Sequence, residues 1–389
     1  MRQSTLSGSK NRWLRAWWLL APLFMVACGS GGSGEHLASD PGTSQQRATS
    51  LPPVTGAARN FAYALSNDAA NRGVSTYAID PTSGALKAVG VPVAAGDNPV
   101  SAAATPGGKF LYVANSRSDN VTAYHITPAT GTLNPLGSVA AGSNPQSIAV
   151  HPGGTAVYVA NFNSNTISAY TIGATGALTP IGTPIATGTN PIAIAMHPGG
   201  KFAYAANPGS DNINAYSIDA GGALTQIGAP VAAGSLPGAL VVDPSGRFAY
   251  AANRGSSDIS AYSINSTGTL APIGTPTPAG SLPQSITVEP TGHFVYVASF
   301  YSQDVSAYAI SASGALTLVN DAVSPQGQQP SSVNAEPGGK FVYAIRYAFR
   351  NFSEIATYAI NPTTGALAET GTPTPIVGAN AITTVHTLQ

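Results

Sequence analysis

Hydrophobic and polar positions alternate in short runs that recur at a nearly constant spacing from about residue 60 to the C-terminus. One unit, residues 144–188, reads NPQSIAVHPGGTAVYVANFNSNTISAYTIGATGALTPIGTPIATG. Four of its runs are rich in β-branched and aromatic residues, and Pro-Gly, Asn-Ser and Gly turns separate them. Each unit therefore predicts four short antiparallel strands that are joined by tight turns.

Two series of tyrosines define the length of the repeat. The first series has successive spacings of 49, 46, 46, 46, 46 and 47 residues: Tyr63, Tyr112, Tyr158, Tyr204, Tyr250, Tyr296 and Tyr343. The second series follows it by 12 to 15 residues: Tyr77, Tyr124, Tyr170, Tyr216, Tyr262, Tyr308 and Tyr358. Seven units with four strands each predict an all-β fold, a seven-bladed β-propeller of four-stranded antiparallel blades. The tyrosines fall on the second and third strands, where large side chains fill the space between face-packed blades.

The two ends of the repeat region match different strands of a blade. The chain enters at NFAYALS, a second strand, and ends at NAITTVHTLQ, which matches innermost strands such as NPQSIAVHP. We therefore expect the propeller to span residues 60–389, with its ring closed by the C-terminal strand, which completes the N-terminal blade. Such closure removes the open sheet edges that invite aggregation. Deletion of the residues after Ala379 is expected to abolish folding.

The N-terminus has a different pattern, in which a basic stretch and the 12 apolar residues 16–27 precede the only cysteine, Cys28. This run is too short to span a bilayer and predicts an export signal over residues 1–27. The tetrapeptide MVAC resembles the bacterial lipoprotein processing site, which implies a lipid-modified Cys28, and Gly29 after it implies delivery to the outer membrane. The alternative is an ordinary secretory signal that leaves an unpaired thiol.

Composition changes the picture after the leader. Residues 28–59 contain few large apolar side chains and no period, which predicts a lipidated cysteine followed by a flexible tether. Only 8% of all residues are charged, and four of the 16 basic residues lie in the leader, so the remaining chain is mildly acidic. It offers no basic patch suited to nucleic acid. We expect membrane contact through the lipid anchor alone and localisation in the bacterial cell envelope.

The repeat motifs resemble those of a known family. YVAN at 112–115 and 158–161, YAAN at 204–207 and 250–253, and HPGG from His151 and His197 are similar to the seven-bladed propeller lactonases and YVTN-type repeat proteins. The resemblance covers residues 60–389. It implies a propeller fold and an activity such as hydrolysis of 6-phosphogluconolactone or, as in a related fungal enzyme, lactone formation on muconate. The matching residues are turn and core residues, so they specify the fold more than the activity.

The family's proposed working residues are ionisable His, Arg and Glu side chains near the starts of the innermost strands, around the top of the channel. The corresponding positions here, six residues before each strand-end proline, with one counterpart in the last strand, are Val100, Gln146, Ile192, Gly238, Gln284, Ser331 and Ala381. None can act as an acid, a base or an oxyanion partner, which lactone hydrolysis requires. His151 and His197 belong to turns a whole blade apart, which favours a structural role over a shared metal.

The clearest break in the repeat is YAIRYAFRNFSEIATYAI, residues 343–360, in which three extra residues enlarge a loop. Candidate ligand-binding residues lie in this loop, in the equivalent loop of the preceding unit and in two loops near the start of the ring: Arg346, Tyr347, Arg350, Glu354, Phe300, Tyr301, Arg72 and Asp97. Arginines beside aromatic rings can hold a carboxylate, a sugar acid or a partner surface. The alternative is that blades near the closure are irregular because uniform packing matters less there.

Three functions remain open from the sequence. The leading hypothesis is a lipid-anchored extracytoplasmic propeller that binds a small acidic or sugar-derived ligand, or an envelope or surface protein, through its top face. The second is a lactone hydrolase that uses Arg346, Arg350 and a carboxylate of Asp97 or Glu354; export weighs against the cytoplasmic sugar phosphate as substrate. The third is a surface or adhesion protein in which the propeller is a rigid spacer. None of the three hypotheses includes a cofactor or a metal ion.

Overall fold

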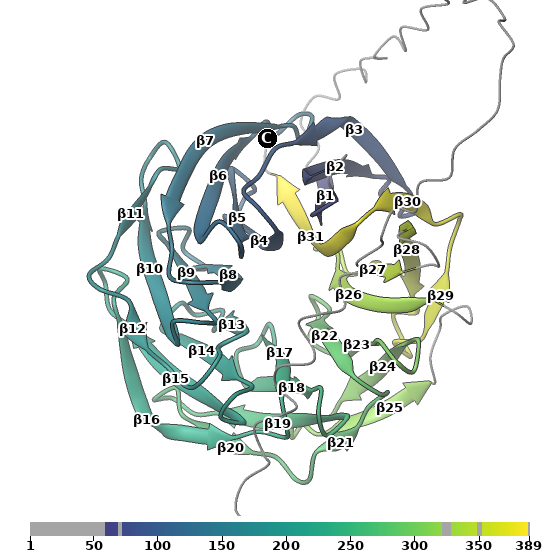
Figure 1. Ribbon diagram of the computed structural model, residues 1–389. Coiled ribbons are helices and arrows are strands. Elements are labelled where there is room, and N and C mark those ends of the chain that lie inside the picture. Colours follow the sequence, from purple (N-terminus) through teal and green to yellow (C-terminus); the bar gives the residue numbers. More distant parts are fainter. Residues whose placement is uncertain (1–58, 69–71, 321–327, 348–351, 388–389) are drawn as a thin grey trace, which may run out of the picture. The chain divides into compact units, whose positions relative to one another are not determined.

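The computed structural model describes residues 59–68, 72–320, 328–347 and 352–387 of the chain. Within these ranges the strands form seven antiparallel sheets, the blades, arranged in a ring (Figure 1). No described helix is long and apolar enough to cross a membrane. The predicted leader, Cys28 and the tether lie outside the described residues.

The two inner strands of every blade are short and regular. The innermost strands surround the central channel and are, from blade 1 to blade 7, β31 (Ala379–Thr387), β4 (Pro99–Ala104), β8 (Pro145–Val150), β13 (Ala193–Met196), β17 (Pro237–Val242), β22 (Pro283–Val288) and β26 (Gln329–Ala335). The second strands are β1 (Arg59–Ser66), β5 (Phe110–Asn115), β9 (Ala156–Asn161), β14 (Phe202–Asn207), β18 (Phe248–Asn253), β23 (Phe294–Ser299) and β27 (Phe341–Tyr347).

The two outer strands complete each blade, and the outermost one is the least regular. The third strands are β2 (Gly73–Ile79), β6 (Asn120–Ile126), β10 (Thr166–Ile172), β15 (Asn212–Ile218), β19 (Asp258–Ile264), β24 (Asp304–Ile310) and β28 (Phe352–Ile360). The outermost strands are β3 (Leu86–Val93), β7 (Leu133–Ala140), β11 (Leu178–Pro180) with β12 (Ile185–Ala186), β16 (Leu224–Ala232), β20 (Leu270–Pro272) with β21 (Thr277–Pro278), β25 (Leu316–Asn320), and β29 (Leu367–Glu369) with β30 (Thr374–Val377).

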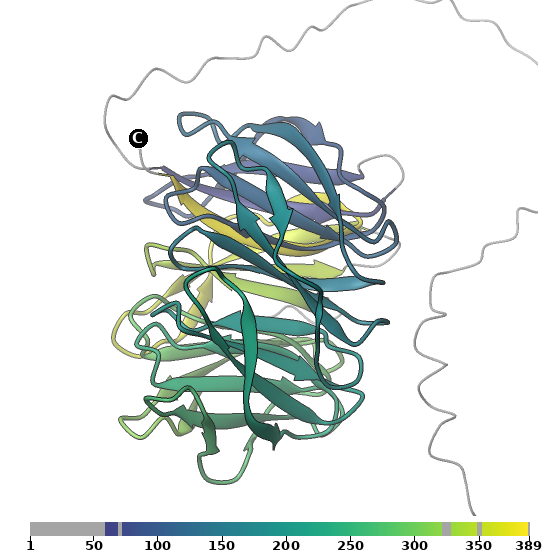
Figure 2. The ribbon, with the colours of Figure 1, turned by 90° about the vertical axis from the view of Figure 1, so that its left-hand side faces the viewer.

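The ring closes as the sequence predicts. Strand β31, the last of the chain, pairs antiparallel with β1, the first, from Arg59 opposite Thr387 to Ser66 opposite Ala379. Figure 1 shows β31 passing inside β1 beside the channel, and the side view in Figure 2 shows the blades following one another around the ring. Blade 1 is therefore built from both ends of the propeller, which makes its formation depend on the whole chain between them.

The first tyrosine series links each blade to the next. The Tyr63 hydroxyl donates a hydrogen bond to the Gly131 carbonyl at 2.8 Å, and the Tyr343 hydroxyl donates to the Gly84 carbonyl at 2.8 Å, which joins blade 7 to blade 1. The other five tyrosines of the series make the same bond to the next blade's glycine: Tyr112, Tyr158, Tyr204, Tyr250 and Tyr296. All seven side chains are fully buried, so each contributes both apolar burial and a satisfied polar group.

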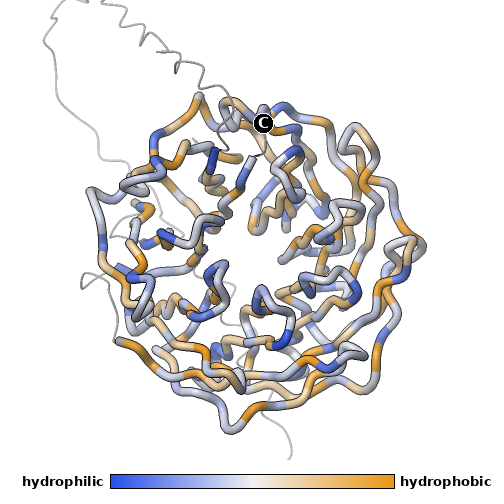
Figure 3. Tube along the Cα trace, turned by 180° about the vertical axis from the view of Figure 1, so that it is seen from behind, coloured by the Kyte–Doolittle hydropathy of each residue, from blue (hydrophilic) through white to orange (hydrophobic). Residues whose placement is uncertain are grey.

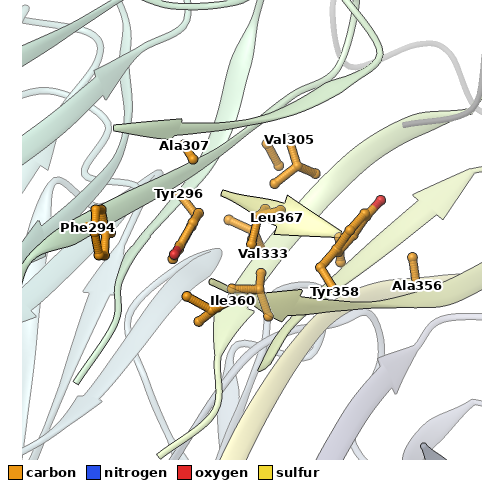
Figure 4. Packing of buried hydrophobic residues seen from close by; sticks show 12 residues of the cluster. Phe294, Tyr296, Val305, Ala307, Val333, Ala356, Tyr358, Ile360 and Leu367 are labelled. Atoms are coloured by element: carbon orange, nitrogen blue, oxygen red, sulfur yellow. The ribbon is translucent and has the colours of Figure 1, made fainter. Parts of the chain in front are cut away.

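The glycine at each of these contacts is required by its surroundings. At Gly365 the backbone has φ +74°, and a Cβ atom would lie 2.1 Å from the Phe294 ring. Figure 4 shows Phe294 and Tyr296 of blade 6 in one cluster with Tyr358 and Leu367 of blade 7. Such clusters recur between blades, and hydrophobic stretches follow the whole ring in Figure 3. Burial of each large side chain stabilises the fold by about 1.5–3 kcal/mol.

Candidate functional site

A pocket of about 610 Å³ lies in the channel where the innermost strands begin. Its volume is typical of small-molecule sites, for which about 300–1,000 Å³ is usual. Residues of all seven innermost strands contribute to its wall. Polar uncharged groups from around the ring line it: Ser101, Gln146, Ser147, Gln284, Ser285, Ser331, Ser332, Asn334, Asn380 and Thr383. The pocket therefore offers many hydrogen-bonding groups to a polar ligand.

Arg254 is the one charged side chain among the described residues that line this pocket. It follows β18 directly, and its backbone N–H donates to the Leu236 carbonyl at 2.9 Å, which fixes the start of its loop. The Arg254 side chain forms no ion pair or hydrogen bond within the part of the chain that the structure describes, and its Nε is buried. A guanidinium without a partner at the wall of a pocket is a donor available for an anionic ligand.

Gly238 makes room for this arginine. A Cβ atom on Gly238 would lie 2.1 Å from the Arg254 Nε and 2.5 Å from its Cδ, so the guanidinium stem crosses directly over the glycine. Gly238 occupies one of the seven positions six residues before the strand-end proline, and it is the only one without a side chain. Two coordinated changes from the repeat, a glycine in β17 and an arginine after β18, therefore place one positive charge in the channel.

The ionisation of Arg254 reflects its surroundings. Burial lowers the pKa of Arg254 to about 10, because the charged form loses part of its hydration. The group is still protonated at neutral pH, and an incoming anion would replace the lost hydration with a charge-assisted hydrogen bond.

An aromatic wall adjoins this position. Phe300 follows β23 and Tyr347 ends β27, and both occupy the place in their blades that Arg254 occupies in blade 5. Their ring centroids are 6.2 Å apart with an interplanar angle of 66°, and both residues line the pocket. The Tyr347 hydroxyl donates to Asn380 Oδ1 at 3.5 Å, and burial raises the pKa of Tyr347, so that it stays a donor at neutral pH. These rings offer apolar surface in the same pocket as the cationic group.

Arg346, a candidate from the sequence, lies elsewhere. Its side chain is fully buried inside blade 7, where it contacts Glu369 with both terminal nitrogens at 3.0 and 2.8 Å. It also donates to Glu354 at 2.7 Å and to the Tyr358 hydroxyl at 3.1 Å. Burial alone would lower the pKa of Arg346, but the hydrogen bond and charge of Glu369, with Tyr358 and Glu354, raise it overall. Both Arg346 and Glu354 therefore serve the packing of the blade.

Three of the remaining candidates, Arg72, Asp97 and Tyr301, are not part of the pocket wall. Arg72 and Asp97 form an ion pair at 3.2 Å, in which both side chains are nearly half exposed. The ring of Tyr301 is exposed and lies 5.5 Å from that of Phe300, but Tyr301 is not part of the pocket wall. Arg350 lies outside the described residues. Of the eight candidates, the structure thus brings Phe300 and Tyr347 together in the pocket.

Arg254 was missed by the sequence reasoning, although a signal for it exists. The residues four positions after the first-series tyrosines are Asn67, Ser116, Phe162, Pro208, Arg254, Phe300 and Tyr347. Arg254 is the single charged residue at this repeat position. Gly238 is the single glycine at the other repeat position, six residues before the strand-end proline. The structure also corrects one alignment: Asn380, not Ala381, is the counterpart of Val100, because Ala381 pairs with Leu65 as Ser101 pairs with Ala114. In blade 1 the residue equivalent to Val100 is therefore Asn380, which carries an amide.

The sequence profile of the family described as lactonase, 7-bladed β-propeller, matches residues 54–149, 138–283, 224–326 and 281–384. These matches cover nearly all of the repeat region. The chain belongs to this lactonase family. No curated protein matches the chain significantly.

Solved structures of lactonase-like propellers share the fold. A putative 6-phosphogluconolactonase from Bacteroides uniformis is 23% identical with a TM-score of 0.75, and the match covers 84% of this chain and 99% of that one. The periplasmic gluconolactonase PpgL from Pseudomonas aeruginosa is 21% identical with a TM-score of 0.72, covering 85% and 99%. A putative 6-phosphogluconolactonase from Bacteroides fragilis is 22% identical with a TM-score of 0.73, covering 86% and 99%. At these identities the similarity establishes the fold alone.

Proposed function

We propose that this lactonase-family propeller binds a small carboxylic acid of the sugar-acid class in the pocket at the start of its innermost strands. The observation that carries the proposal is Arg254, an unpartnered guanidinium that is the one charged group among the described pocket-lining residues. A carboxylate would accept from the guanidinium, the aromatic wall of Phe300 and Tyr347 would pack against the apolar face of the sugar, and the ring of amides and hydroxyls would bind its hydroxyl groups.

Lactone hydrolysis is the second candidate, and family membership supports it. Hydrolysis needs a base that activates water. Among the described lining residues the other ionisable side chain is Tyr347, and its raised pKa keeps it protonated. The described geometry therefore supports binding of an acid better than opening of a lactone.

The test is isothermal titration calorimetry of the purified protein with gluconate, with glucose as the uncharged control. Gluconate should bind, and Arg254→Met should weaken its binding by at least tenfold because a charge-assisted hydrogen bond is lost. Arg254→Lys keeps the charge but loses the planar guanidinium. Its gluconate affinity should lie between that of the unchanged protein and that of Arg254→Met. Equal gluconate affinity in Arg254→Met and the unchanged protein would refute the assignment. Release of gluconate from glucono-δ-lactone faster than the spontaneous rate would favour the hydrolase.

We further propose that the protein is an exported lipoprotein anchored through Cys28. The leader and the MVAC tetrapeptide support this, and one structural neighbour is described as periplasmic. Cys28→Ser should move the protein from the membrane fraction to the soluble fraction on cell fractionation, while a serine substitution in the tether at Gly29 should not. Membrane retention of Cys28→Ser would rule out the lipid anchor.

A further inference from the structure

Serine side chains join neighbouring innermost strands around the channel. An innermost strand has one edge unpaired within its own blade, so alternate backbone N–H groups face the channel, where a side chain of the neighbouring blade can reach them (Figure 1). The Ser101 hydroxyl accepts from the Ile148 N–H at 3.3 Å, and the Ser147 hydroxyl accepts from the Ile194 N–H at 3.2 Å. We call this set of contacts the serine ladder.

The serine ladder continues on the other side of the ring. The Ser285 hydroxyl accepts from the Val333 N–H at 3.1 Å, and the Ser332 hydroxyl accepts from the Ile382 N–H at 3.4 Å. These four serines occupy one repeat position, five residues before the strand-end proline. The donor in each bond is the N–H of the equivalent residue of the next innermost strand: Ile148, Ile194, Val333 and Ile382. Because the same bond recurs at four blade junctions, we expect the equivalent N–H of the other innermost strands to point the same way.

The serine ladder is interrupted at three junctions, on both sides of β17 and between β31 and β4, where Ala381 takes the serine position. By the repeat, Ala193 of blade 4 takes the serine position next to the Leu240 N–H, and Ala239 of blade 5 takes the serine position next to the Ile286 N–H. Among the described residues, neither N–H has a side-chain acceptor there. Strand β17 is also the strand that carries Gly238 beneath Arg254. Three departures from the repeat, namely two missing hydroxyls and one added cation, therefore coincide at one wall of the pocket.

A second kind of departure marks the same two blades. The residue before the innermost-strand proline adopts a positive φ in blades 2 to 6: Asn98, Asn144, Asn190, Leu236 and Leu282. Asparagine tolerates this conformation, whereas leucine at φ 53° and 56° is strained. The two leucines hold the loops that begin with Arg254 and Phe300, since their carbonyls accept from the N–H groups of these residues at 2.9 and 3.0 Å. The strain adds to the set of changes around β17.

We propose that the N–H groups of Leu240 and Ile286, together with Arg254, form a site for the oxyanion group of the ligand, a carboxylate or a phosphate. This inference rests on the proposed function, because it assigns the donors that hold the charged end of the same ligand. Backbone N–H groups at a channel wall need an acceptor, and an anion is the strongest acceptor for them. All three residues line the pocket, and no carboxylate is among the described lining residues to repel the anion.

The experiment restores the serine ladder one junction at a time. Ala193→Ser and Ala239→Ser would each supply the hydroxyl that other blades carry, which would accept the Leu240 or the Ile286 N–H and take it from the anion. Ala381→Ser is the matched control, because Ala381 occupies the same repeat position in blade 1 and faces the Ala102 N–H, two blade junctions away from β22. Calorimetry of the purified protein would use gluconate and inorganic phosphate as probes, and thermal unfolding would verify that each variant is folded.

The three possible results separate the inference from the proposed function. We expect gluconate affinity to fall by about fivefold to tenfold in Ala193→Ser and in Ala239→Ser, and to stay unchanged in Ala381→Ser. Unchanged affinity in both ladder variants, with loss of binding in Arg254→Met, would overturn the inference and leave the proposed function standing. Failure of the unchanged protein to bind either probe would overturn both. Displacement of gluconate by phosphate would identify the phosphate class, and its absence the carboxylate class.

Discussion

Arg254 in blade 5 and Arg346 in blade 7 are both arginines at the end of the second strand of their blade, yet their surroundings are opposite. Arg346 is fully buried and contacts two carboxylates and a tyrosine hydroxyl, and its pKa is raised. Arg254 forms no side-chain bond among the described residues, and burial lowers its pKa. The comparison separates a cation that completes the interior of a blade from one that remains available to a ligand.

The two arginines also differ in how they depart from the repeat. Arg346 lies near the end of β27, beside a lengthened connection, and its partners Glu354 and Glu369 come from the third and outermost strands of the same blade. Arg254 stands in a repeat of unaltered length, where single substitutions change the chemistry and leave the backbone in place. In a repeat protein, an insertion therefore draws attention to itself, but the charges in the strands beside it can be fully used by the fold. A substitution in register places a new group at a predetermined point of the channel.

The largest effect expected is on stability, from Arg346→Met. Removing the guanidinium leaves the carboxylates of Glu354 and Glu369 without a cation in a partly buried site, where they are 22% and 24% exposed. The free energy of unfolding should fall by about 3 kcal/mol, near the lower end for loss of one partner from a buried ion pair, because solvent still reaches both carboxylates. Urea unfolding followed by circular dichroism measures this change.

Arg254→Met is the matched control, since it removes the same atoms from the unpaired arginine. Its free energy of unfolding should not fall, because removing a charge that burial desolvates without a partner relieves a cost to the folded state. Comparable destabilisation by the two substitutions would contradict the distinction between the structural and the available arginine.

A smaller effect is expected from Gly238→Ala, which tests whether the glycine positions Arg254. The backbone of Gly238 does not have a positive φ, so alanine is compatible with the strand, but its Cβ would displace the Arg254 stem. Gluconate affinity should fall by about tenfold, while the free energy of unfolding changes by less than about 1 kcal/mol. Gly173→Ala, at a glycine outside the pocket whose φ is also not positive, is the control for the glycine-to-alanine change itself. Full affinity in Gly238→Ala would show that Arg254 does not need this space.

The fold could be predicted because its determinants recur. Each first-series tyrosine donates to the carbonyl of a glycine in the next blade, and each such glycine follows the same turn. The same interface between blades is therefore encoded seven times in the sequence. The C-terminal strand could be placed because its sequence matches the innermost strands. The confirmed closure of blade 1 by β31 is therefore a consequence of the repeat itself.

The site could be predicted only in part, because its residues interact across strands and blades in ways that spacing does not reveal. Phe300 and Tyr347 were found from the irregular loops, but the pairing of Arg346 with Glu369 depends on the register of β28 and β29. Gly238 has no ionisable group, so the sequence alone does not single it out as a site residue. Its lack of a side chain nevertheless leaves the space that the Arg254 side chain occupies. Aligning the seven blades column by column would have shown both departures together.

The smallest effect expected comes from pH, which should distinguish the two arginines without a mutation. The pKa of Arg254 is lowered to about 10, so its charge is lost at a lower pH than that of an ordinary arginine. Gluconate affinity should therefore be constant from pH 7 to about 9 and fall by about twofold at pH 10 and fourfold at pH 10.5. Arg346, whose pKa is raised, should stay charged and keep blade 7 intact over this range.

Calorimetry at each pH measures this affinity, and near-ultraviolet circular dichroism shows whether the fold persists. The fold should persist to about pH 10, because burial raises the pKa of the first-series tyrosines, so the folded protein keeps their protons where an unfolded chain begins to lose them. Above that value tyrosine ionisation favours unfolding, so only the interval in which the dichroism is unchanged bears on Arg254. Constant gluconate affinity through pH 10.5 in the folded protein would mean that a group other than Arg254 holds the anion, whereas a decrease that disappears in Arg254→Met would assign the titration to this one side chain.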